Sequence, residues 1–418
     1  MDLHAQIRAM GDRALAAAHR LAEASTRRKN SALLAMADAL LRDQSAIQAA
    51  NREDIEAAAA AGLSDAMVDR LTLTDARFAA MVQGLRDVAA LPDPVGKVLG
   101  RVKRPNGLVI VKRRVPLGVI AILYESRPNV TADAAALCLK SSNAVILRGG
   151  KEAIRSNLAI AASLSSALAG TGIPADAVQL VPVTDRDAVR ELVQMDDRVD
   201  VVIPRGGESL IRAVMEQARV PVLKHYKGVC HIFVEKSADL GTALAIVENA
   251  KCQRPGTCNA VETLLVDEAI AGAFLPMLAG MAARRNVEIR ADAAARAIVP
   301  AFAPASPGDW DAEYLDFILA VRVVGTLRAA IEHINRHGSR HSDAIVTTNP
   351  RAARAFLKRV DSAAVYVNAS TRFTDGAEFG LGAEMGISTD KLHARGPVGL
   401  AELTTYKYEV TGDGQLRG

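Results

Sequence analysis

The chain has 418 residues, which at roughly 150 residues per domain predicts about three domains. Half of the residues are hydrophobic (50%) and 23% are charged, so the chain can bury a large core and is not disordered by composition. The net charge of +4, the short basic runs 27–29 and 112–114 and the 4% of aromatic residues supply neither the basic face nor the stacking platforms of a nucleic-acid-binding protein.

We expect both basic runs to lie on solvated surfaces, and the sequence carries no export or membrane signal. The polar start lacks the apolar stretch of a signal peptide. The uncharged run 269–283 is shorter than the roughly 20 residues that span a bilayer, and the run 156–175 is interrupted by serine, glycine and proline. Both are predicted to be buried helices. Four cysteines are too few for a disulfide scaffold, which fits a reducing compartment. We therefore expect a cytoplasmic protein.

The first ninety residues are predicted to be helical and to be followed by a β-hairpin. Apolar residues between Leu33 and Leu41 fall on one helical stripe, and Pro92 with the residues after it ends the helical region. Residues 97–104 and 108–115 are rich in β-formers, and Asn106-Gly107 between them suits a tight turn. The hairpin carries few core-forming residues, so we expect it to project and to pair with another segment.

From residue 117 onward, short apolar strands alternate with helical segments. This rhythm predicts an α/β fold with parallel sheets covered by helices on both faces. A glycine-rich stretch, residues 374–386, leads to a final segment that alternates as an added edge strand does. The predicted strands are 119–123, 144–147, 178–181, 199–203, 231–234, 261–266, 317–324, 364–367 and 403–410.

Two glycine pairs follow predicted strands and open predicted helices. They stand in Arg148-Gly149-Gly150-Lys151 and in Arg205-Gly206-Gly207-Glu208. Glycines at the carboxyl end of a strand let a ligand approach the backbone, and the helix N-terminus offers N–H groups to a phosphate. The alternative is a pair of ordinary tight turns, because neither matches the G-x-G-x-x-G fingerprint or a Walker loop. Two such junctions in one α/β half favour a nucleotide site.

Cys258 is the candidate nucleophile among the four cysteines. It follows a Pro-Gly loop just before a predicted strand, and the nearby Arg254 favours the thiolate. The alternative is a small buried hydrophobe, as we expect for Cys138 and Cys230, whereas Cys252 shares the loop and stays ambiguous. The spacing of His333, His337 and His341 suits metal ligands on a helix, but no further ligand completes the set, and we expect no metal.

Several motifs together resemble the γ-glutamyl phosphate reductases, a branch of the aldehyde dehydrogenase superfamily. The resemblance covers nearly the whole chain, and its motifs occur in order. They are Tyr124-Glu125-Ser126-Arg127-Pro128-Asn129-Val130-Thr131, Ile203-Pro204-Arg205-Gly206-Gly207, His225-Tyr226-Lys227-Gly228, residues 253–259 and Phe379-Gly380-Leu381-Gly382-Ala383-Glu384-Met385-Gly386.

This resemblance implies three parts. An NADP-binding α/β domain would comprise residues 1–96, 117–228 and 362–400, and a catalytic α/β domain would span 229–361. An oligomerisation element would combine the hairpin 97–116 with the tail 401–418, and we expect the tail to pair with the hairpin of a neighbouring subunit. The chain is expected to form a homo-oligomer. Glutamate 5-kinase is the candidate partner for functional coupling, and the sequence does not decide whether the two are coupled.

The resemblance also implies a reaction. The Cys258 thiolate would attack L-glutamyl 5-phosphate and expel phosphate to leave a thioester, which NADPH would reduce to L-glutamate 5-semialdehyde in proline biosynthesis. A hydrolytic aldehyde dehydrogenase of other specificity is the alternative. Such enzymes use a glutamate on the segment before the catalytic domain, but here residues 223–228 contain no acid, and Lys224 and Lys227 could instead meet the phosphate.

Further site roles follow from the same resemblance. The thioester oxyanion would be held by the Cys258 N–H and by a side chain from the loop of Arg127 and Asn129. Arg254 and Arg372 are candidate substrate ligands, Arg372 for the α-carboxylate. Glu313 would hold the nicotinamide ribose, with a solvated surface charge as its alternative role, and Arg148 would favour a 2′-phosphate. The expected cofactor-binding residues are Arg148, Gly149, Gly150, Lys151, Arg205, Gly206, Gly207 and Glu313.

Overall fold

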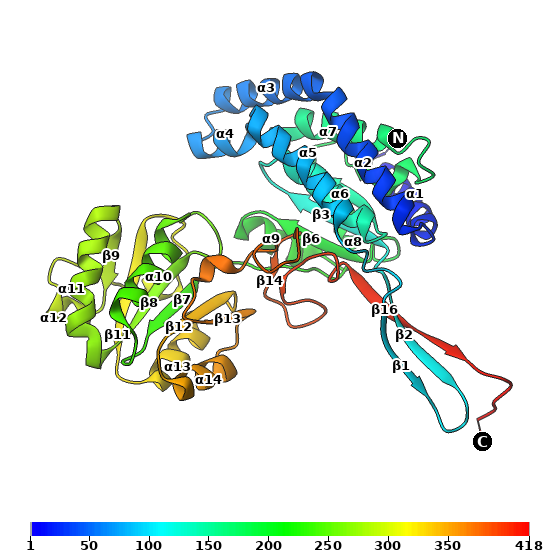
Figure 1. The fold of residues 1–418 in the computed structure, drawn as a ribbon. Coiled ribbons are helices and arrows are strands. Elements are labelled where there is room, and N and C mark those ends of the chain that lie inside the picture. The colour runs from blue at the N-terminus through cyan, green and yellow to red at the C-terminus, as the bar shows by residue number, and fades with distance from the viewer. Residues whose placement is uncertain (1, 418) are drawn as a thin grey trace. The chain divides into compact units, whose positions relative to one another are not determined.

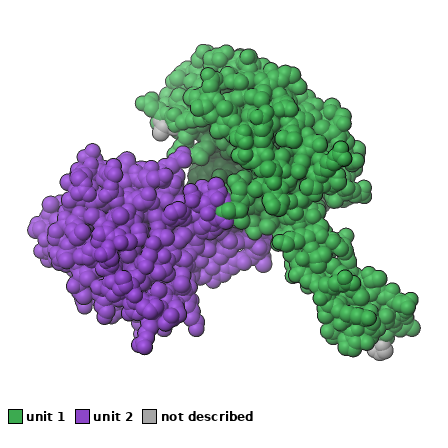
Figure 2. Space-filling view, in the orientation of Figure 1, with its two compact units in different colours: residues 1–224, 380–386, 398–418 green, residues 225–379, 387–397 purple. Residues whose placement is uncertain are grey.

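The computed structural model describes residues 2–417, which divide into two compact units (Figures 1 and 2). Unit 1 contains residues up to 224 together with 380–386 and those from 398 on, and unit 2 contains 225–379 and 387–397. Within residues 2–417 the chain therefore passes four times from one unit to the other. This division differs from the expected one, because residues 225–228, 362–379 and 387–397 lie in unit 2 rather than with the nucleotide-binding part.

Unit 1 begins with a helical layer, as the sequence predicts. Side-chain caps fix two of the helix starts: Ser25 accepts the N–H of Arg28, and Thr74 accepts that of Arg77. The layer ends at Ala90, just before Pro92. Its helices are α1 (Leu3–Ala22), α2 (Thr26–Arg42), α3 (Gln44–Ala60), α4 (Asp65–Leu71) and α5 (Asp75–Ala90).

A parallel sheet forms the centre of unit 1, in the order β5-β4-β3-β6 within the described residues. Its strands and the N-terminal helices share one continuous hydrophobic core. The strands are β3 (Val119–Tyr124), β4 (Ala144–Arg148), β5 (Val178–Leu180) and β6 (Val201–Arg205), and the helices between and after them are α6 (Asn129–Lys140), α7 (Ile154–Ala167), α8 (Arg186–Gln194) and α9 (Glu208–Gln217).

The predicted hairpin is present, and it gains a third strand from the C-terminal tail (Figure 1). β1 (Val98–Lys103) and β2 (Val109–Pro116) are antiparallel, and Gly107 takes the positive φ of +91° that their turn requires. β16 (Thr404–Thr411) pairs with β2 of the same chain from Thr404↔Pro116 to Thr411↔Val109. The expectation that the tail pairs with a neighbour's hairpin is therefore wrong, because its partner is in its own chain.

Unit 2 is built on a parallel sheet, whose order within the described residues is β10-β9-β11-β8-β7-β12-β13. Helices pack on both faces of this sheet over separate apolar clusters. The strands are β7 (Cys230–Val234), β8 (Val261–Asp267), β9 (Glu288–Ala291), β10 (Ala303–Pro304), β11 (Ile318–Val324), β12 (Ser342–Val346) and β13 (Ala364–Val367). The helices are α10 (Leu240–Cys252), α11 (Glu268–Arg285), α12 (Ala293–Ile298), α13 (Leu327–His337) and α14 (Pro350–Arg359). A short β14 (Ile387–Ser388) pairs with β15 (Gly396–Pro397).

Lys29 does not lie on a solvated surface as expected, although it belongs to a basic run. Its side chain is 1% exposed, and its ammonium contacts Asp93 at 2.7 Å and Ser142 at 2.8 Å. Burial lowers the pKa of Lys29, and Asp93 opposes that shift. The ammonium thus joins α2 to the loops after α5 and α6. Within residues 2–417, no helix is long and apolar enough to cross a membrane.

Candidate active site

The Cys258 loop connects α10 to β8 in unit 2. Helix α10 ends at Cys252, and β8 begins at Val261, so the Pro-Gly segment 253–260 carries Cys258 at the entrance of a buried strand, as predicted. Cys258 is half-buried, whereas Cys138 and Cys230 are buried, which agrees with the structural role expected for them. Partial exposure leaves the Cys258 thiol within reach of a substrate.

The start of β7 lies directly against the backbone of Cys258. The Cys230 thiol donates a hydrogen bond to the Cys258 carbonyl at 3.2 Å, and burial raises the pKa of Cys230, which keeps this donor protonated. A Cβ on Gly228 would lie 1.9 Å from the Cys258 carbonyl oxygen, so only glycine fits there. Sequence reasoning quoted Gly228 within a motif but gave it no role.

Arg372 holds the Cys258 loop from the opposite side. Its guanidinium donates to Gln253 at 2.8 Å and to the side chain of Asn259. The Asn259 amide donates to the Thr374 carbonyl at 3.0 Å, and the Thr371 hydroxyl donates to the Asn259 carbonyl at 2.7 Å. Arg372 therefore has a clamping role that the sequence did not predict, and its role toward a substrate carboxylate stays a prediction.

Arg372 lies near both Cys258 and Arg254. Burial lowers the pKa of Arg372, and its charged neighbours include Arg254, which lowers that pKa further, and Cys258, which raises it. Arg254 is exposed at the mouth of the loop. Positive charge beside a thiol favours its thiolate. The structure thus places Arg372 near Cys258, whereas the sequence analysis named Arg254 as the cation beside this thiol, and that role of Arg254 stays a prediction.

Glu313 is half-buried and lies next to the Cys258 loop rather than on a solvated surface. Its Oε1 accepts the backbone N–H of Gly228 at 2.7 Å, and Gly228 is the residue whose backbone presses on Cys258. Glu313 and the candidate nucleophile are thereby connected through one residue. This geometry disfavours the solvated alternative that the sequence left open.

In unit 1, three strand ends meet at one edge of the sheet. Arg148 is the last residue of β4 and Arg205 the last of β6, and the parallel β3 lies between these strands. The strand order reverses direction around β3, and ligands of open parallel sheets bind at such a switch point. Both predicted strand–Gly-Gly–helix junctions are present, the first through a short 3₁₀ turn (Lys151–Ala153) before α7.

The loop after β3 joins the two glycine junctions. Glu125 accepts the N–H of Gly207 at 2.9 Å, and a Cβ on Gly206 would lie 2.5 Å from the same carboxylate. On the other side, the Ser126 N–H and hydroxyl both donate to Glu152, at 2.6 and 2.8 Å. A side chain at Gly206 would therefore crowd the Glu125 carboxylate, whereas a Cβ on Gly207 would lie at an ordinary contact distance of 4.0 Å from it.

Arg148 anchors a neighbouring loop at the first junction. It donates to the Thr184 carbonyl at 2.8 Å and to the Gly149 carbonyl at 3.1 Å. Its Nε and the amide nitrogen of Asn157 are buried donors without an acceptor among the described residues. A Cβ on Gly149 would lie 2.1 Å from that amide. Unsatisfied donors beside a glycine suit an acceptor-rich ligand. Lys151 is exposed at the same junction.

The two candidate oxyanion donors, Arg127 and Asn129, lie at the start of α6 in unit 1. Asn129 donates to Asp133 at 2.9 Å, and burial raises the pKa of Asp133 to about 6 against the effects of Asn129 and the nearby Arg205. Arg127 is exposed. The Asn129 amide thus already donates to a residue of its own helix. Which of Arg127 and Asn129 donates to the oxyanion stays a prediction.

Lys224 and Lys227 are both half-buried on the segment where the chain leaves unit 1. Lys224 is the last residue of the long stretch of unit 1, and Lys227 directly precedes Gly228. The imidazole of the intervening His225 contacts the Ile387 carbonyl at 2.8 Å. Residues 223–228 contain no carboxylate that could activate a hydrolytic water.

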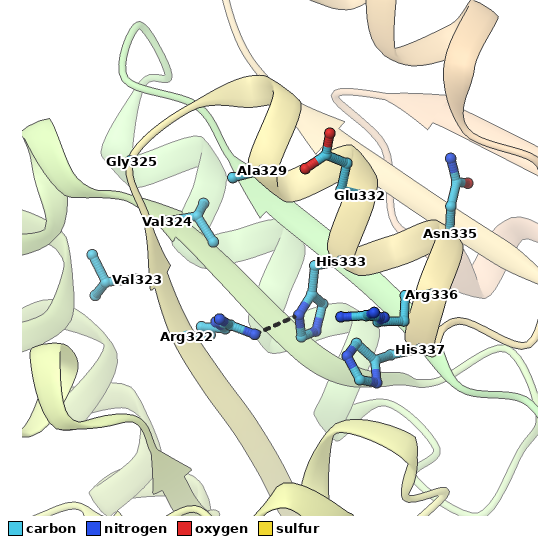
Figure 3. Close-up of a pocket in the computed structure, with 10 residues that line it drawn as sticks. All are labelled: Arg322, Val323, Val324, Gly325, Ala329, Glu332, His333, Asn335, Arg336 and His337. Carbon is cyan, nitrogen blue, oxygen red and sulfur yellow. Dashed lines mark hydrogen bonds between the residues drawn. The ribbon is translucent and has the colours of Figure 1, made fainter.

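A depression of about 860 Å³ on unit 2 lies between the end of β11 and α13 (Figure 3) and contains none of the predicted site residues. Arg322 points to His333 and donates to its Nδ1 at 3.0 Å. Burial, reinforced by His231, lowers the pKa of His333 to about 2. Within residues 2–417, no three histidine, cysteine or acidic side chains form a metal-binding group. His333 and His337 lie on α13, whereas His341 lies beyond the end of that helix.

Known proteins share this architecture. Over residues 3–299 the chain matches the aldehyde dehydrogenase family. It is 56% and 54% identical to the gamma-glutamyl phosphate reductases of Moorella thermoacetica and Geobacter metallireducens, over 417 residues and 100% of both chains in each comparison. The crystal structure of gamma-glutamyl phosphate reductase from Thermotoga maritima superposes with a TM-score of 0.97 at 47% identity, covering 99% of this chain and 100% of that one.

Proposed function

Because the chain belongs to the aldehyde dehydrogenase family, and within it to the gamma-glutamyl phosphate reductases, we propose that it reduces L-glutamyl 5-phosphate to L-glutamate 5-semialdehyde with NADPH, a step of proline biosynthesis. The observation that carries this proposal is the half-buried Cys258, with the Arg372 guanidinium near it and Glu313 bonded to Gly228, whose backbone packs on Cys258. This arrangement suits acyl transfer to a thiolate followed by reduction.

Cys258 performs the first chemical step. Its thiolate attacks the acyl carbon of the substrate, the carbon–oxygen bond to phosphate breaks, and phosphate leaves with the bonding electrons to give a thioester. Arg254 and Arg372 favour the thiolate before attack, and Lys224 and Lys227 supply positive charge for the departing phosphate. The Cys258 N–H and either Arg127 or Asn129 would stabilise the oxyanion.

The residues of unit 1 fit a nucleotide cofactor. Gly206 and Gly207 leave exposed backbone at the second junction, and at the first junction Arg148 Nε and the Asn157 amide nitrogen are buried donors without an acceptor among the described residues. The residues that would hold the nucleotide are Arg148, Gly149, Gly150, Lys151, Arg205, Gly206 and Gly207, with Glu313 for the ribose. When bound there, NADPH would supply the hydride for reduction of the thioester to the aldehyde level. Cys258 is then expelled as a thiolate and is ready for another turnover.

The main alternative is hydrolysis of an aldehyde-derived thioester to an acid. Hydrolysis needs a general base to activate water, whereas residues 223–228 offer two lysines and no carboxylate. An acyl phosphate carries its own leaving group, so reduction needs no such base. The absence of an acid in this segment therefore favours the reductase.

The test is the reverse reaction. L-glutamate 5-semialdehyde should reduce NADP only when inorganic phosphate is added, because phosphate must release the acyl group from Cys258. A matched reaction with sulfate in place of phosphate is the control. Reduction of NADP at the same rate without phosphate would identify a hydrolytic enzyme and overturn the proposal.

We further propose that the enzyme is a cytoplasmic homo-oligomer whose subunits meet through the sheet β1-β2-β16. The strand register places Val102, Ile110, Tyr408 and Val410 on one face of this sheet. Val102, Tyr408 and Val410 are 46%, 60% and 57% exposed in the single chain. Lys112, opposite Tyr408, lies on the same face, so the apolar part of the face is formed by Val102, Ile110 and Val410. Such an exposed apolar patch is suited to a second subunit. Coupling to a glutamate 5-kinase would protect the labile acyl phosphate and stays a prediction.

A further inference from the structure

A buried ion pair lies at the base of the Cys258 loop. The Lys251 ammonium contacts Glu262 Oε2 at 2.6 Å, and both side chains are 0% exposed. Lys251 stands in the last turn of α10 and Glu262 near the start of β8, so the pair joins the two ends of the segment that carries Cys258. Sequence reasoning missed both residues, although a charged residue inside each of two apolar runs was a signal.

The second oxygen of Glu262 binds another functional loop. Glu262 Oε1 accepts the N–H of Leu315 at 3.3 Å, and Leu315 has a positive φ of +54°, which is uncommon for a residue with a side chain. Leu315 lies two residues after Glu313. The intervening Tyr314 donates from its hydroxyl to Asp309 at 2.6 Å, and Lys251 Nζ lies 5.9 Å from the centre of its ring.

These contacts close a ring around the candidate nucleophile. At one end, Glu313 accepts the N–H of Gly228, whose backbone presses on Cys258. At the other end, Glu262 binds both the Leu315 N–H and Lys251, which stands before the Cys258 loop. The loop of the nucleophile and the loop of the ribose acid are therefore tied together at both ends.

We propose that Lys251 and Glu262 are positioning residues. They fix the Glu313 loop relative to Cys258, so that the cofactor ribose bound by Glu313 is held in a defined position relative to the nucleophile. The proposal rests on the proposed function, because it assigns Glu313 to the cofactor ribose. An ion pair is a poor way to stabilise a core, since apolar residues of similar volume are often as stable. Its geometric contribution comes from the Glu262 carboxylate, whose two oxygens bind Lys251 and the Leu315 N–H, because an apolar residue cannot make either contact.

Two double variants separate geometry from charge. Lys251→Met with Glu262→Gln removes both charges but keeps a side-chain oxygen for the Leu315 N–H. Lys251→Met with Glu262→Leu removes that acceptor as well. We expect the dissociation constant for NADPH, measured by its fluorescence, to stay within twofold of wild type in the Gln variant. In the Leu variant it should rise about fivefold or more, as the loss of one hydrogen bond predicts.

Hydrogen exchange measures the Cys258 loop and the Glu313 loop separately. The amides of residues 253–260 should exchange faster in both double variants, because both lack the Lys251–Glu262 bond. The amides of residues 313–316 should exchange faster only in the Leu variant. Glu248→Gln is the matched control, because Glu248 lies on the same helix and pairs with Arg285 at 2.6 Å on the surface. It should leave both segments and NADPH binding unchanged.

Equal NADPH affinity in the two double variants would overturn the positioning role and leave a purely structural pair. If the Leu variant does not fold, Glu262→Asp keeps the charge balance but shortens the side chain by one methylene, so it cannot reach both partners. It should also weaken NADPH binding about fivefold, and wild-type affinity in this variant would equally reject the proposal. Wild-type protein that binds NADPH but fails the reverse assay would reject the proposed function alone.

Discussion

Cys258 joins three properties of a nucleophile: partial exposure, neighbouring positive charge and a backbone held by Gly228 and Cys230. We expect Cys258→Ala to lose at least about a hundredfold in turnover, a barrier increase of about 2.7 kcal/mol, with NADPH affinity unchanged. Steady-state rates and NADPH fluorescence check this. The control is Cys252→Ala at the end of α10, which should retain activity. A Cys258→Ala variant that keeps more than about one hundredth of the activity contradicts a covalent route.

Arg148 allows a test of cofactor choice. If its guanidinium meets the 2′-phosphate, Arg148→Ala loses about 1.5–3 kcal/mol of binding, and the apparent constant for NADPH rises roughly 10- to 150-fold while that for NADH hardly changes. The structure also gives Arg148 a bond to the Thr184 carbonyl, so an equal loss with both cofactors would instead show that it only holds the loop. Arg186→Ala, which removes a neighbouring charge, is the control.

His341 makes unit 2 sensitive to acid. Burial, reinforced by His225, lowers the pKa of His341 from 6.5 to about 3. Between these values the unfolded chain binds a proton that the folded chain rejects, so stability falls as pH drops from about 6.5, by up to about 1.4 kcal/mol per pH unit. His341→Gln should reduce this slope and leave the part that His333 contributes. The measurement is urea unfolding followed by fluorescence of Trp310, the single tryptophan, which lies in unit 2. The exposed His4→Gln should keep the wild-type slope.

At the scale of single residues, the local sequence identified the reactive residues better than it identified which side chains contact each other. The Pro-Gly loop before a strand identified Cys258, and the Gly-Gly junctions were found from their place between strand and helix. The partners of Lys29 and of Glu262 could not be found, because Asp93 and Leu315 are 64 and 53 residues distant in the chain. Such contacts depend on how elements pack, which periodicity does not contain.

At the scale of elements, the sheet β1-β2-β16 offers the sharpest test of assembly. Val410→Lys places a charge on the apolar face of an edge strand, which should prevent a second subunit from covering it. We expect the mass measured by light scattering to fall with no loss of secondary structure. Thr411→Lys, on the other face of the same strand, is the control. An unchanged mass for Val410→Lys would reject this face as the interface.

The elements themselves were largely predicted, while their order in space was not. The strands 144–147 and 261–266 coincide with β4 and β8 to within one residue. The tail 403–410 was correctly predicted as an edge strand but assigned to a neighbour's hairpin. Alternation shows that a strand has an exposed face and says nothing about which β2 it joins. For the same reason, the sequence could not show that β13 completes the sheet of unit 2.

At the scale of the whole molecule, the two units have separate cores. Leu403 is 0% exposed in the core of unit 1, and Phe356 is 0% exposed in unit 2. Phe356→Ala should lower the free energy of unfolding of unit 2 by about 3–5 kcal/mol and shift the Trp310 transition. Leu403→Ala should destabilise unit 1 by about 2–5 kcal/mol and leave that transition in place, with the loss seen by hydrogen exchange of β3 and β4. A common shift in both variants would show one cooperative unit.

The four passages of the chain between units also set an order for biosynthesis. A ribosome releases residues 225–397 before the segment 398–418 that completes unit 1, so unit 2 has all of its own residues first although it comes second in the sequence. Until residues 398–418 are made, the edge of β2 that pairs with β16 and the part of the core that Leu403 fills stay uncovered. In the nascent protein, unit 1 is therefore expected to need chaperones until the last segment is made, whereas unit 2 is not.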